Sequence, residues 1–98
     1  MSLLDVKRED RRFQILKALA AENDYSIHDG VLRLLLADYG HKESSDTIRT
    51  DIAWLGEQGL VTSKAVDTSI VATITRRGAE VAEGAAVVPG VRRPRPGE

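Results

Sequence analysis

Few groups of side chains in this sequence could carry covalent chemistry. The residue types of a hydrolytic triad occur in two places, which are His28-Asp29 and His41 with Ser44, Ser45 and Asp46. Nearness in sequence does not create triad geometry, and no nucleophile-elbow pattern surrounds either serine. Two histidines without any cysteine give no zinc-ligand spacing, and no glycine-rich phosphate loop is present. The sequence therefore predicts a protein that is not an enzyme and that holds no cofactor and no metal.

Hydrogen bonding to nucleic acid is a chemistry that suits the segment 45–61 better. Ile48, Ile52 and Leu55 recur at helical spacing and predict a buried stripe. Ser45 suits the helix N-cap, and Gly59 suits its left-handed exit. The opposite face carries short or hydrogen-bonding side chains, which are Asp46, Thr47, Arg49, Thr50 and Ala53. Such a face can lie in a DNA major groove without being held away from the base edges.

The same segment resembles the recognition helix and following strand of winged helix-turn-helix transcriptional regulators of the ArsR, MarR and DeoR type. The family pattern is met by Ser45, Thr47, Arg49, Asp51, Ile52, Leu55, Gly59, Leu60 and Val61. A second family mark follows in register, the strand-to-helix step Ile74-Thr75-Arg76-Arg77-Gly78. The match covers about residues 13–84. The short chain with its Pro/Arg tail also resembles small regulator-like proteins encoded in Mu-like prophages.

The resemblance implies an α+β fold, with a three-helix core, a small antiparallel wing hairpin and a short C-terminal helix. It also implies contacts with double-stranded DNA from Lys42, Ser45, Thr47, Arg49, Thr50, Lys64 and Arg76. Arg49 is expected to reach a guanine edge or a phosphate, the alternative being a solvated arginine paired with Asp46. Many relatives carry a second basic residue where Thr50 stands. Asp51 is expected to make a structural hydrogen bond or ion pair.

Periodicity, caps and turn residues predict where the elements lie. We expect helices over about 5–22, 27–39, 45–58 and 76–83, strands over about 25–26, 60–63 and 70–74, and a wing loop over 64–69. Ser26 is expected to cap the second helix and Thr75 the fourth, with Gly40 and Gly84 as helix ends. The second helix has a nearly continuous apolar surface, which predicts that it is the most buried helix. Trp54 is expected to pack against the first helix or the wing sheet, with a subunit contact as the alternative.

Composition limits the class of protein. A chain of 98 residues makes one domain, and no apolar run approaches the ~20 residues that span a membrane. The N-terminus has no signal-peptide pattern, so we expect a cytoplasmic protein. The net charge of −1 is unusual for a DNA-binding domain. A winged-helix protein-interaction adaptor that does not bind DNA is therefore the alternative function.

The two ends of the chain differ from its middle. We expect a winged-helix domain over 1–84 and an extended or mobile Pro/Arg-containing tail over 85–98. Leu3, Leu4 and Val6 exceed what a small core needs, so we expect a homodimer through the first helix and its N-terminal extension. The arginines of that helix, Arg8, Arg11 and Arg12, alternate with Glu9 and Asp10, which predicts a solvated face with helical charge pairs.

Overall fold

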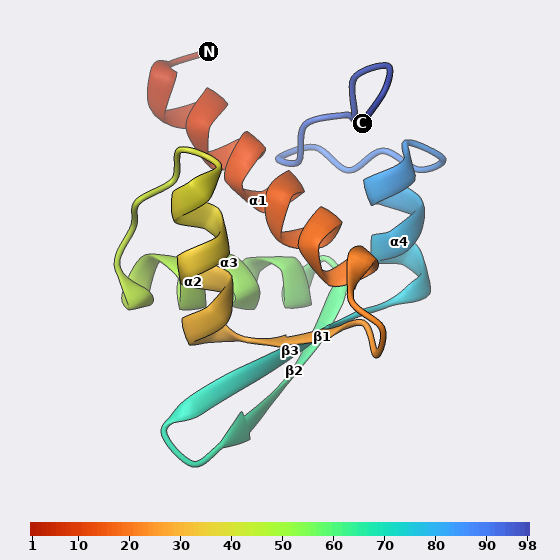
Figure 1. Cartoon of the computed structure of the whole chain (residues 1–98). Coiled ribbons are helices and arrows are strands. Elements are labelled where there is room, and N and C mark those ends of the chain that lie inside the picture. Colours follow the sequence, from red (N-terminus) through yellow and green to blue (C-terminus); the bar gives the residue numbers. More distant parts are fainter.

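The computed structural model describes all 98 residues as four helices and one three-stranded antiparallel sheet (Figure 1). The elements in chain order are α1 (Leu3–Ala21), β1 (Ser26–His28), α2 (Asp29–Asp38), α3 (Ser45–Glu57), β2 (Val61–Val66), β3 (Ser69–Ile74) and α4 (Arg76–Glu83). The expected α+β class is confirmed. None of the four helices combines the length and the apolar character that a membrane crossing requires.

The sheet has the order β1-β3-β2, so the last strand lies between the other two. Ile27 pairs with Ala72 across β1 and β3, and Lys64 pairs with Val71 across β2 and β3. The hairpin is longer than predicted because β2 continues to Val66 and leaves only a tight turn. Asp67 makes that turn with a φ of 57°, a backbone region that aspartate tolerates better than most residues do.

A single core of 16 apolar residues lies between the helices and the sheet. The helix α1 contributes a stripe of four fully covered side chains, and α3 contributes the predicted stripe of Ile48, Ile52 and Leu55. The largest buried side chains are Phe13, Ile15, Leu16, Leu19, Leu32, Leu36, Ile48, Ile52, Leu55 and Leu60. Burial of these side chains removes their apolar surface from water and is the main stabilising contribution to this fold.

The prediction that the second helix is the most buried one is wrong. Among its apolar side chains only Leu32 and Leu36 are buried, on the side of the helix that packs against α1, α3 and the sheet. Four others point outward, Val31, Leu34, Leu35 and Tyr39, with exposed fractions of 47%, 67%, 36% and 61%. A small domain has only one neighbour layer for this helix, so one face is covered and the rest meets solvent.

The helix N-termini begin at other residues than predicted. α2 starts after β1, and the His28 ring, not Ser26, caps it by accepting from the Gly30 amide at 3.0 Å. Ser44 caps α3 in place of Ser45, accepting from the Thr47 amide at 3.1 Å. α1 starts at Leu3 rather than Asp5, because Ser2 and Asp5 form a reciprocal capping box. These shifts of one to two residues leave the predicted helical faces unchanged.

The step from β3 into α4 matches its prediction. The Thr75 hydroxyl accepts from the Gly78 amide at 3.0 Å and caps α4, which ends at Gly84 with a φ of 86°. Gly78 is required here because a Cβ atom at this position would lie 2.1 Å from the carbonyl oxygen of Leu60. The motif therefore holds α4 tightly against the chain segment that leaves α3.

The segment 85–98 contains no helix or strand, as expected, but it is not a free tail. It runs from α4 back to α1 and turns beside that helix (Figure 1), and it buries Val88 and Val91 in the core. The Arg92 guanidinium lies 4.1 Å from the centroid of the Phe13 ring. The proline and glycine content predicted that this segment has no helix or strand. The burial of Val88 and Val91 explains why it is nevertheless docked on the domain.

Candidate functional site

The outer face of α3 is lined by small polar side chains. Ser45 and Thr50 are exposed, and Thr47 is half-buried. The Thr50 hydroxyl donates to the Asp46 carbonyl at 2.9 Å, and the Ser44 hydroxyl donates to that of Thr47 at 3.1 Å. These contacts hold the hydroxyl groups close to the helix backbone, so the face is shallow and could approach a flat or grooved partner closely.

Arg49, the residue expected to read DNA, is held by contacts within the chain. Its Nε donates to a carboxylate oxygen of Asp29 at 2.7 Å, and one terminal nitrogen donates to the Thr68 carbonyl at 2.6 Å. Its partner is thus the first residue of α2, rather than Asp46 or another neighbour on α3. The side chain remains 42% exposed, and its Nη1 has no partner within the chain. Arg49 therefore joins α3, α2 and the hairpin turn.

Asp29, the carboxylate that binds Arg49, is buried. One of its oxygens binds Arg49 and the other accepts from the Ile70 amide at 3.1 Å. Burial raises the pKa of Asp29, but the hydrogen bonds from Arg49 and from the Ile70 amide outweigh that effect and hold the pKa below its usual value. The carboxylate thus stays ionised and ties the start of α2 to β3.

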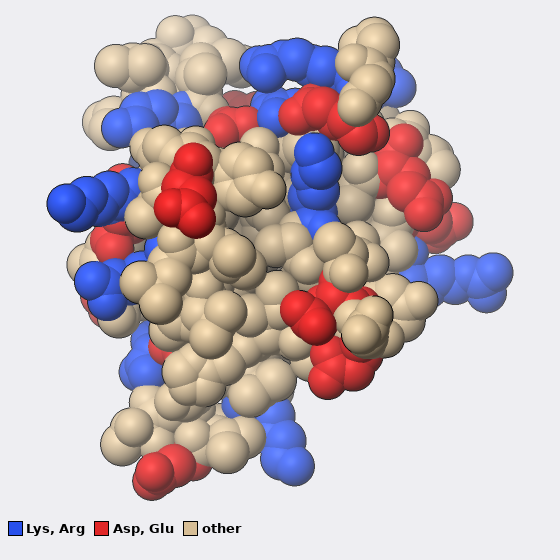
Figure 2. Space-filling model, viewed as in Figure 1, with Lys and Arg blue, Asp and Glu red and all other residues tan.

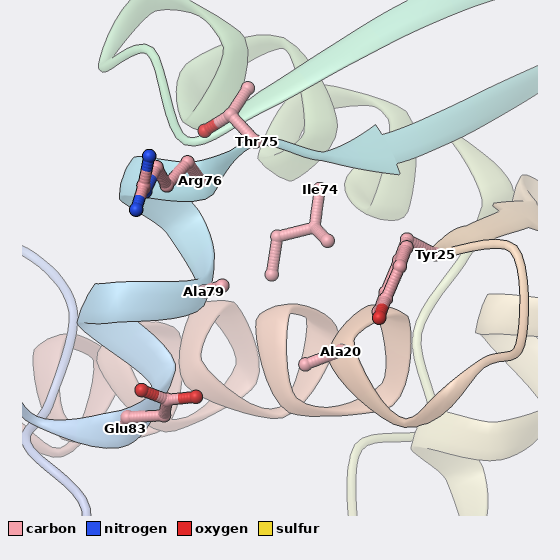
Figure 3. Close-up of a pocket in the computed structure, with 7 residues that line it drawn as sticks. All are labelled: Ala20, Tyr25, Ile74, Thr75, Arg76, Ala79 and Glu83. Atoms are coloured by element: carbon pink, nitrogen blue, oxygen red, sulfur yellow. The ribbon is translucent and has the colours of Figure 1, made fainter.

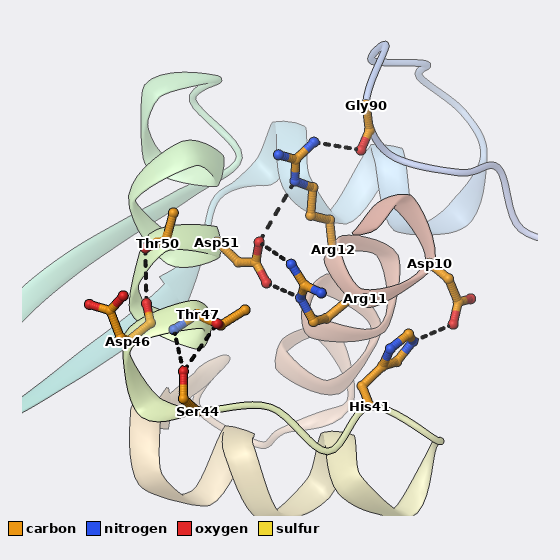
Figure 4. Close-up of polar contacts among 10 residues, drawn as sticks. All are labelled: Asp10, Arg11, Arg12, His41, Ser44, Asp46, Thr47, Thr50, Asp51 and Gly90. Carbon is orange, nitrogen blue, oxygen red and sulfur yellow. Dashed lines mark hydrogen bonds and ion pairs between the residues drawn. The ribbon is translucent and has the colours of Figure 1, made fainter. Parts of the chain in front are cut away.

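A second polar cluster lies between α1 and the first turns of α3 (Figure 4). Arg11 holds the buried Asp51 with two nitrogens, and Arg12 lies 3.9 Å from the same carboxylate. The structural ion pair expected for Asp51 is confirmed. These groups line an open polar hollow of about 310 Å³, together with Arg8, Asp46, Thr47 and Thr50. The predicted solvated face is wrong for Arg11 and Arg12, which turn inward toward α3.

The two inward arginines experience different surroundings. The hydrogen bonds to Asp51 raise the pKa of Arg11, whereas burial lowers the pKa of Arg12. The Arg12 guanidinium lies 3.7 Å from the Trp54 ring centroid and donates to the Gly90 carbonyl at 3.1 Å. Trp54 therefore packs against α1, as predicted, and also under the segment after α4. Arg8 is the most exposed arginine of the hollow, and its guanidinium lies 3.8 Å from the Asp5 carboxylate on the surface.

The C-terminal segment is fixed by a chain of charges on the other side of α1. Asp10 accepts from His41 and from Arg92, each at 2.6 Å, and Arg92 also binds Glu98 through two nitrogens at 2.8 Å. Burial raises the pKa of Asp10, but the bonds from Arg92 and His41 leave it lowered. The hydrogen bond from Arg92 lowers the pKa of Glu98 to about 2. This network holds the segment 85–98 and the turn before α3 on α1.

The remaining residues expected at the site are dispersed. Lys42 is exposed in the turn before α3, and Lys64 is exposed on β2. Arg76 begins α4 and lines a separate open hollow of about 360 Å³ with Tyr25 and Glu83 (Figure 3). That hollow shares no lining residue with the one beside α3. The structure thus brings Ser45, Thr47, Arg49 and Thr50 together on α3 and leaves Arg76 apart from them.

Sequence reasoning missed the contribution of α1 to this site. Arg8, Arg11 and Arg12 are spaced i, i+3 and i+4, which places them on one helical face. That spacing was a usable signal, since three arginines on one face need anionic partners or solvent. The acidic residues between them obscured the signal. Which partner faces the arginines depends on how α1 crosses α3.

Comparison with known proteins gives a clear relation. A protein of Escherichia phage Mu, the uncharacterized protein gp26, is 46% identical over 92 residues, which are 94% of this chain and 95% of gp26. The chain belongs to the family of phage Mu gp26. An uncharacterized protein of Haemophilus influenzae is 37% identical over 78 residues, which are 79% of this chain and 76% of that protein. No family model matches the chain.

The relation to gp26 agrees with the resemblance to proteins of Mu-like prophages. It extends over 94% of the chain, so it includes most of the α3 face and of the docked segment after α4. Neither relative carries an activity, a ligand or a regulatory role in its name. DNA binding therefore stays a prediction, argued below from the geometry.

Proposed function

We propose that this chain is a winged helix-turn-helix protein that binds double-stranded DNA as a small phage-type transcriptional regulator. The observation that carries the proposal is topological. The order α1-β1-α2-α3-β2-β3, with β3 between β1 and β2, is the arrangement expected of a winged helix. In that arrangement α3 is the helix that enters the major groove, and the hairpin β2–β3 is the wing beside it.

The outer face of α3 supports the proposal by its shape. Ser45, Thr50 and Ala53 are exposed and short, so base edges could approach the helix closely. Arg8, Lys42 and Lys64 are exposed cations of α1, the turn and the wing. Lys42 and Lys64 form no ion pair within the chain, and Arg8 has only its surface pair with Asp5 at 3.8 Å. In the proposal these three neutralise backbone phosphates and orient α3.

Arg49 has a narrower role in this proposal than a bidentate guanine contact. Two of its nitrogens hold Asp29 and the Thr68 carbonyl, which leaves Nη1 as the free donor. We propose that this donor makes a single contact to a phosphate or a base edge, while the other two keep the wing aligned with α3. One substitution at Arg49 would then affect both the DNA contact and the wing position.

Fluorescence anisotropy with random and selected duplexes, at two salt concentrations, tests the proposal. Arg49→Ala removes both the free donor and the wing contact, whereas Asp29→Asn weakens the ion pair but keeps the guanidinium. A direct DNA contact predicts that Arg49→Ala weakens binding and lowers the salt slope by about one unit, while Asp29→Asn does not. Equal losses in the two variants would assign Arg49 a structural role only.

Thr50→Arg is the complementary variant. It adds the second basic residue that many winged helices carry at this position, on an exposed part of α3. We expect higher affinity for random duplex and a steeper salt dependence, with an unchanged circular dichroism spectrum. If neither the natural protein nor this variant binds any duplex in a salt-sensitive manner, DNA binding by this protein is excluded.

We further propose that the protein acts as a homodimer. One recognition helix contacts a short stretch of DNA, and two linked half-sites multiply both affinity and specificity. The N-terminal turns of α1 are the expected interface because Leu3 and Leu4 are exposed there. A monomer in light scattering at tens of micromolar would contradict this proposal, since interfaces of ordinary size persist in that range.

The second candidate is a winged-helix adaptor that binds a protein instead of DNA. Two observations favour it. Arg49 is held within the chain, and the outer side of α3 exposes two acidic residues, Asp46 and Glu57. An adaptor would show no duplex binding even at low salt, where electrostatic attraction to DNA is strongest. The anisotropy measurement therefore separates the two candidates.

A further inference from the structure

The first turns of α1 form an apolar surface without a partner, called here the α1 tip. Figure 1 shows this end of α1 projecting beyond α2 and the body of the domain. Its members are Met1, Leu3, Leu4 and Val6, with exposed fractions of 94%, 75%, 72% and 49%. The capping box of Ser2 and Asp5 holds these turns helical. The tip is thus a formed structure that nothing in its own chain covers.

The outward side of α2 forms a second apolar surface, called here the α2 face. Its members are the exposed Val31, Leu34, Leu35 and Tyr39. Figure 2 shows an area without charged side chains over the lower part of α2, with an acidic side chain at its upper end. A patch of this kind on a small domain is typical of an interaction site.

The α1 tip cannot cover the α2 face of its own chain. The helix α1 is continuous from Leu3 to Ala21, about 28 Å at 1.5 Å per residue, and it contains no proline or glycine that would bend it. Its core stripe, which includes Phe13 and Leu16, fixes its direction across the domain. A second copy of the chain, in contrast, could place its tip there.

Charge complementarity favours this pairing. On α1, Lys7 stands on the outward side between Leu3 and Leu4, and on α2, Asp38 stands on the outward side beside Leu34. Both are exposed, and neither forms a hydrogen bond or ion pair within the chain. Each apolar surface therefore carries one unpaired charge, and the two charges are opposite.

We propose that the α1 tip of one protomer packs on the α2 face of a second copy and the reverse, giving a two-fold dimer. This proposal rests on the homodimer proposed above and specifies its surfaces. Eight apolar side chains of about 100 Å² each supply on the order of 800 Å² per protomer, which is what one partner contributes to a stable interface. Lys7 meets Asp38 of the partner subunit and sets the register of the two helices. In the two-fold arrangement both tip-to-face contacts form at once, so neither surface stays free to add a third copy.

Sedimentation equilibrium of the full chain and of two variants tests the proposal. Leu4→Asp alters the tip and Leu34→Asp alters the α2 face, and both replace exposed side chains, so folding is preserved. Each is expected to weaken dimerisation at least tenfold, because a charge would be buried in an apolar contact. Val66→Asp, at an exposed apolar residue of the hairpin outside both surfaces, is the matched control and should leave the dimer unchanged.

Charge reversal tests the register. Lys7→Asp and Asp38→Lys should each weaken the dimer, roughly fivefold or more, because each places like charges together. The double variant should restore the dimer, since the opposite charges again meet. Failure of the double variant to recover would overturn the Lys7–Asp38 contact.

The remaining outcomes separate this inference from the proposals on which it rests. If Leu4→Asp dissociates the dimer and Leu34→Asp does not, α1 pairs with α1, and the use of the α2 face is overturned. If both variants remain dimeric, or the natural protein is a monomer, the inference is also overturned. Anisotropy with a half-site duplex reports DNA binding independently, because a monomer presents the same α3 face.

Discussion

The helices α2 and α3 end in the same way but are built into the domain differently. Both finish in a Schellman motif, in which Gly40 and Gly59 adopt positive φ angles. The residue after the glycine is His41 behind α2 and Leu60 behind α3, and both are buried. Leu60 packs in the apolar core, whereas the His41 ring binds Asp10 of α1. One helix end is thus held by apolar contact and the other by a polar contact.

The two helices also show that apolar content does not determine burial. α2 is richer in leucine, yet it buries only Leu32 and Leu36 among its apolar side chains. α3 has fewer large apolar residues and buries all of its predicted stripe. The difference lies in how the apolar side chains are distributed around each helix. Those of the α3 stripe share one face, whereas those of α2 are spread around the helix, and α1, α3 and the sheet cover only the face that carries Leu32 and Leu36. The apolar residues of α3 are thus used within the domain, whereas most of those of α2 remain exposed and available to another partner.

The largest expected effect contrasts one leucine from each helix. Leu55→Ala in α3 should lower the free energy of unfolding by about 2–5 kcal/mol, because it leaves a cavity in a closed core. Leu34→Ala in α2 should change it by less than about 0.5 kcal/mol under monomeric conditions, because the side chain already meets water. Urea unfolding followed by circular dichroism measures both. Equal losses would show that α2 is covered in the monomer.

A smaller effect concerns the charges that join α3 to α1. Asp51→Asn removes the partner of the nearly buried Arg11, and about 1–3 kcal/mol of stability should be lost. Asp46→Asn, on the exposed side of the same helix, is the matched control and should change little. If the two variants unfold at the same urea concentration, the ion pair does not stabilise the domain.

Because α2 and α3 end in the same motif, we expect the same substitution at each end to lower the stability of the domain by a similar, modest amount. Gly40→Ala and Gly59→Ala each force a Cβ atom into left-handed backbone, where L-residues are disfavoured by roughly 1 kcal/mol. No atom crowds either site closely, so the two losses should be similar. Thermal unfolding of both variants checks this. A clearly larger loss at Gly40 would mean that the polar contact of His41 depends on the turn geometry more than the packing of Leu60 does.

The smallest expected effect is a pH dependence at the junction of α2 with α3. Because the folded-state pKa of Asp29 is lowered below its ordinary value of 3.8, its ion pair stabilises the protein fully above that pH. The contribution is lost as the pH falls through the lowered folded pKa. Asp29→Asn should therefore lose less stability between pH 6 and pH 3 than the natural protein does. Urea unfolding at both pH values measures the difference. If the natural protein and Asp29→Asn lose equal stability, the ionised Asp29 does not stabilise the protein.

The sequence determined the local elements of this protein. The stripe Ile48, Ile52 and Leu55, the cap at Thr75 and the left-handed glycines predicted where helices lie and end, because these signals act over a few neighbouring residues. The need for Gly78 was visible as a motif, but its reason, the close approach of the Leu60 carbonyl, became visible only in the fold. Boundaries shifted where two local signals competed, as at Ser44 and Ser45.

Only the tertiary structure decided which faces and charges meet. The partner of Arg49 is Asp29, twenty residues earlier, and the partner of Arg11 is Asp51, forty residues later. The docking of Val88 and Val91 on the core likewise depends on how α1 crosses the domain. Local sequence cannot specify such pairs, because a helical face with arginines or leucines is compatible with several neighbours. The packing of α1 and α2 around the sheet selects one neighbour for each face, and it leaves the α2 face and the α1 tip uncovered.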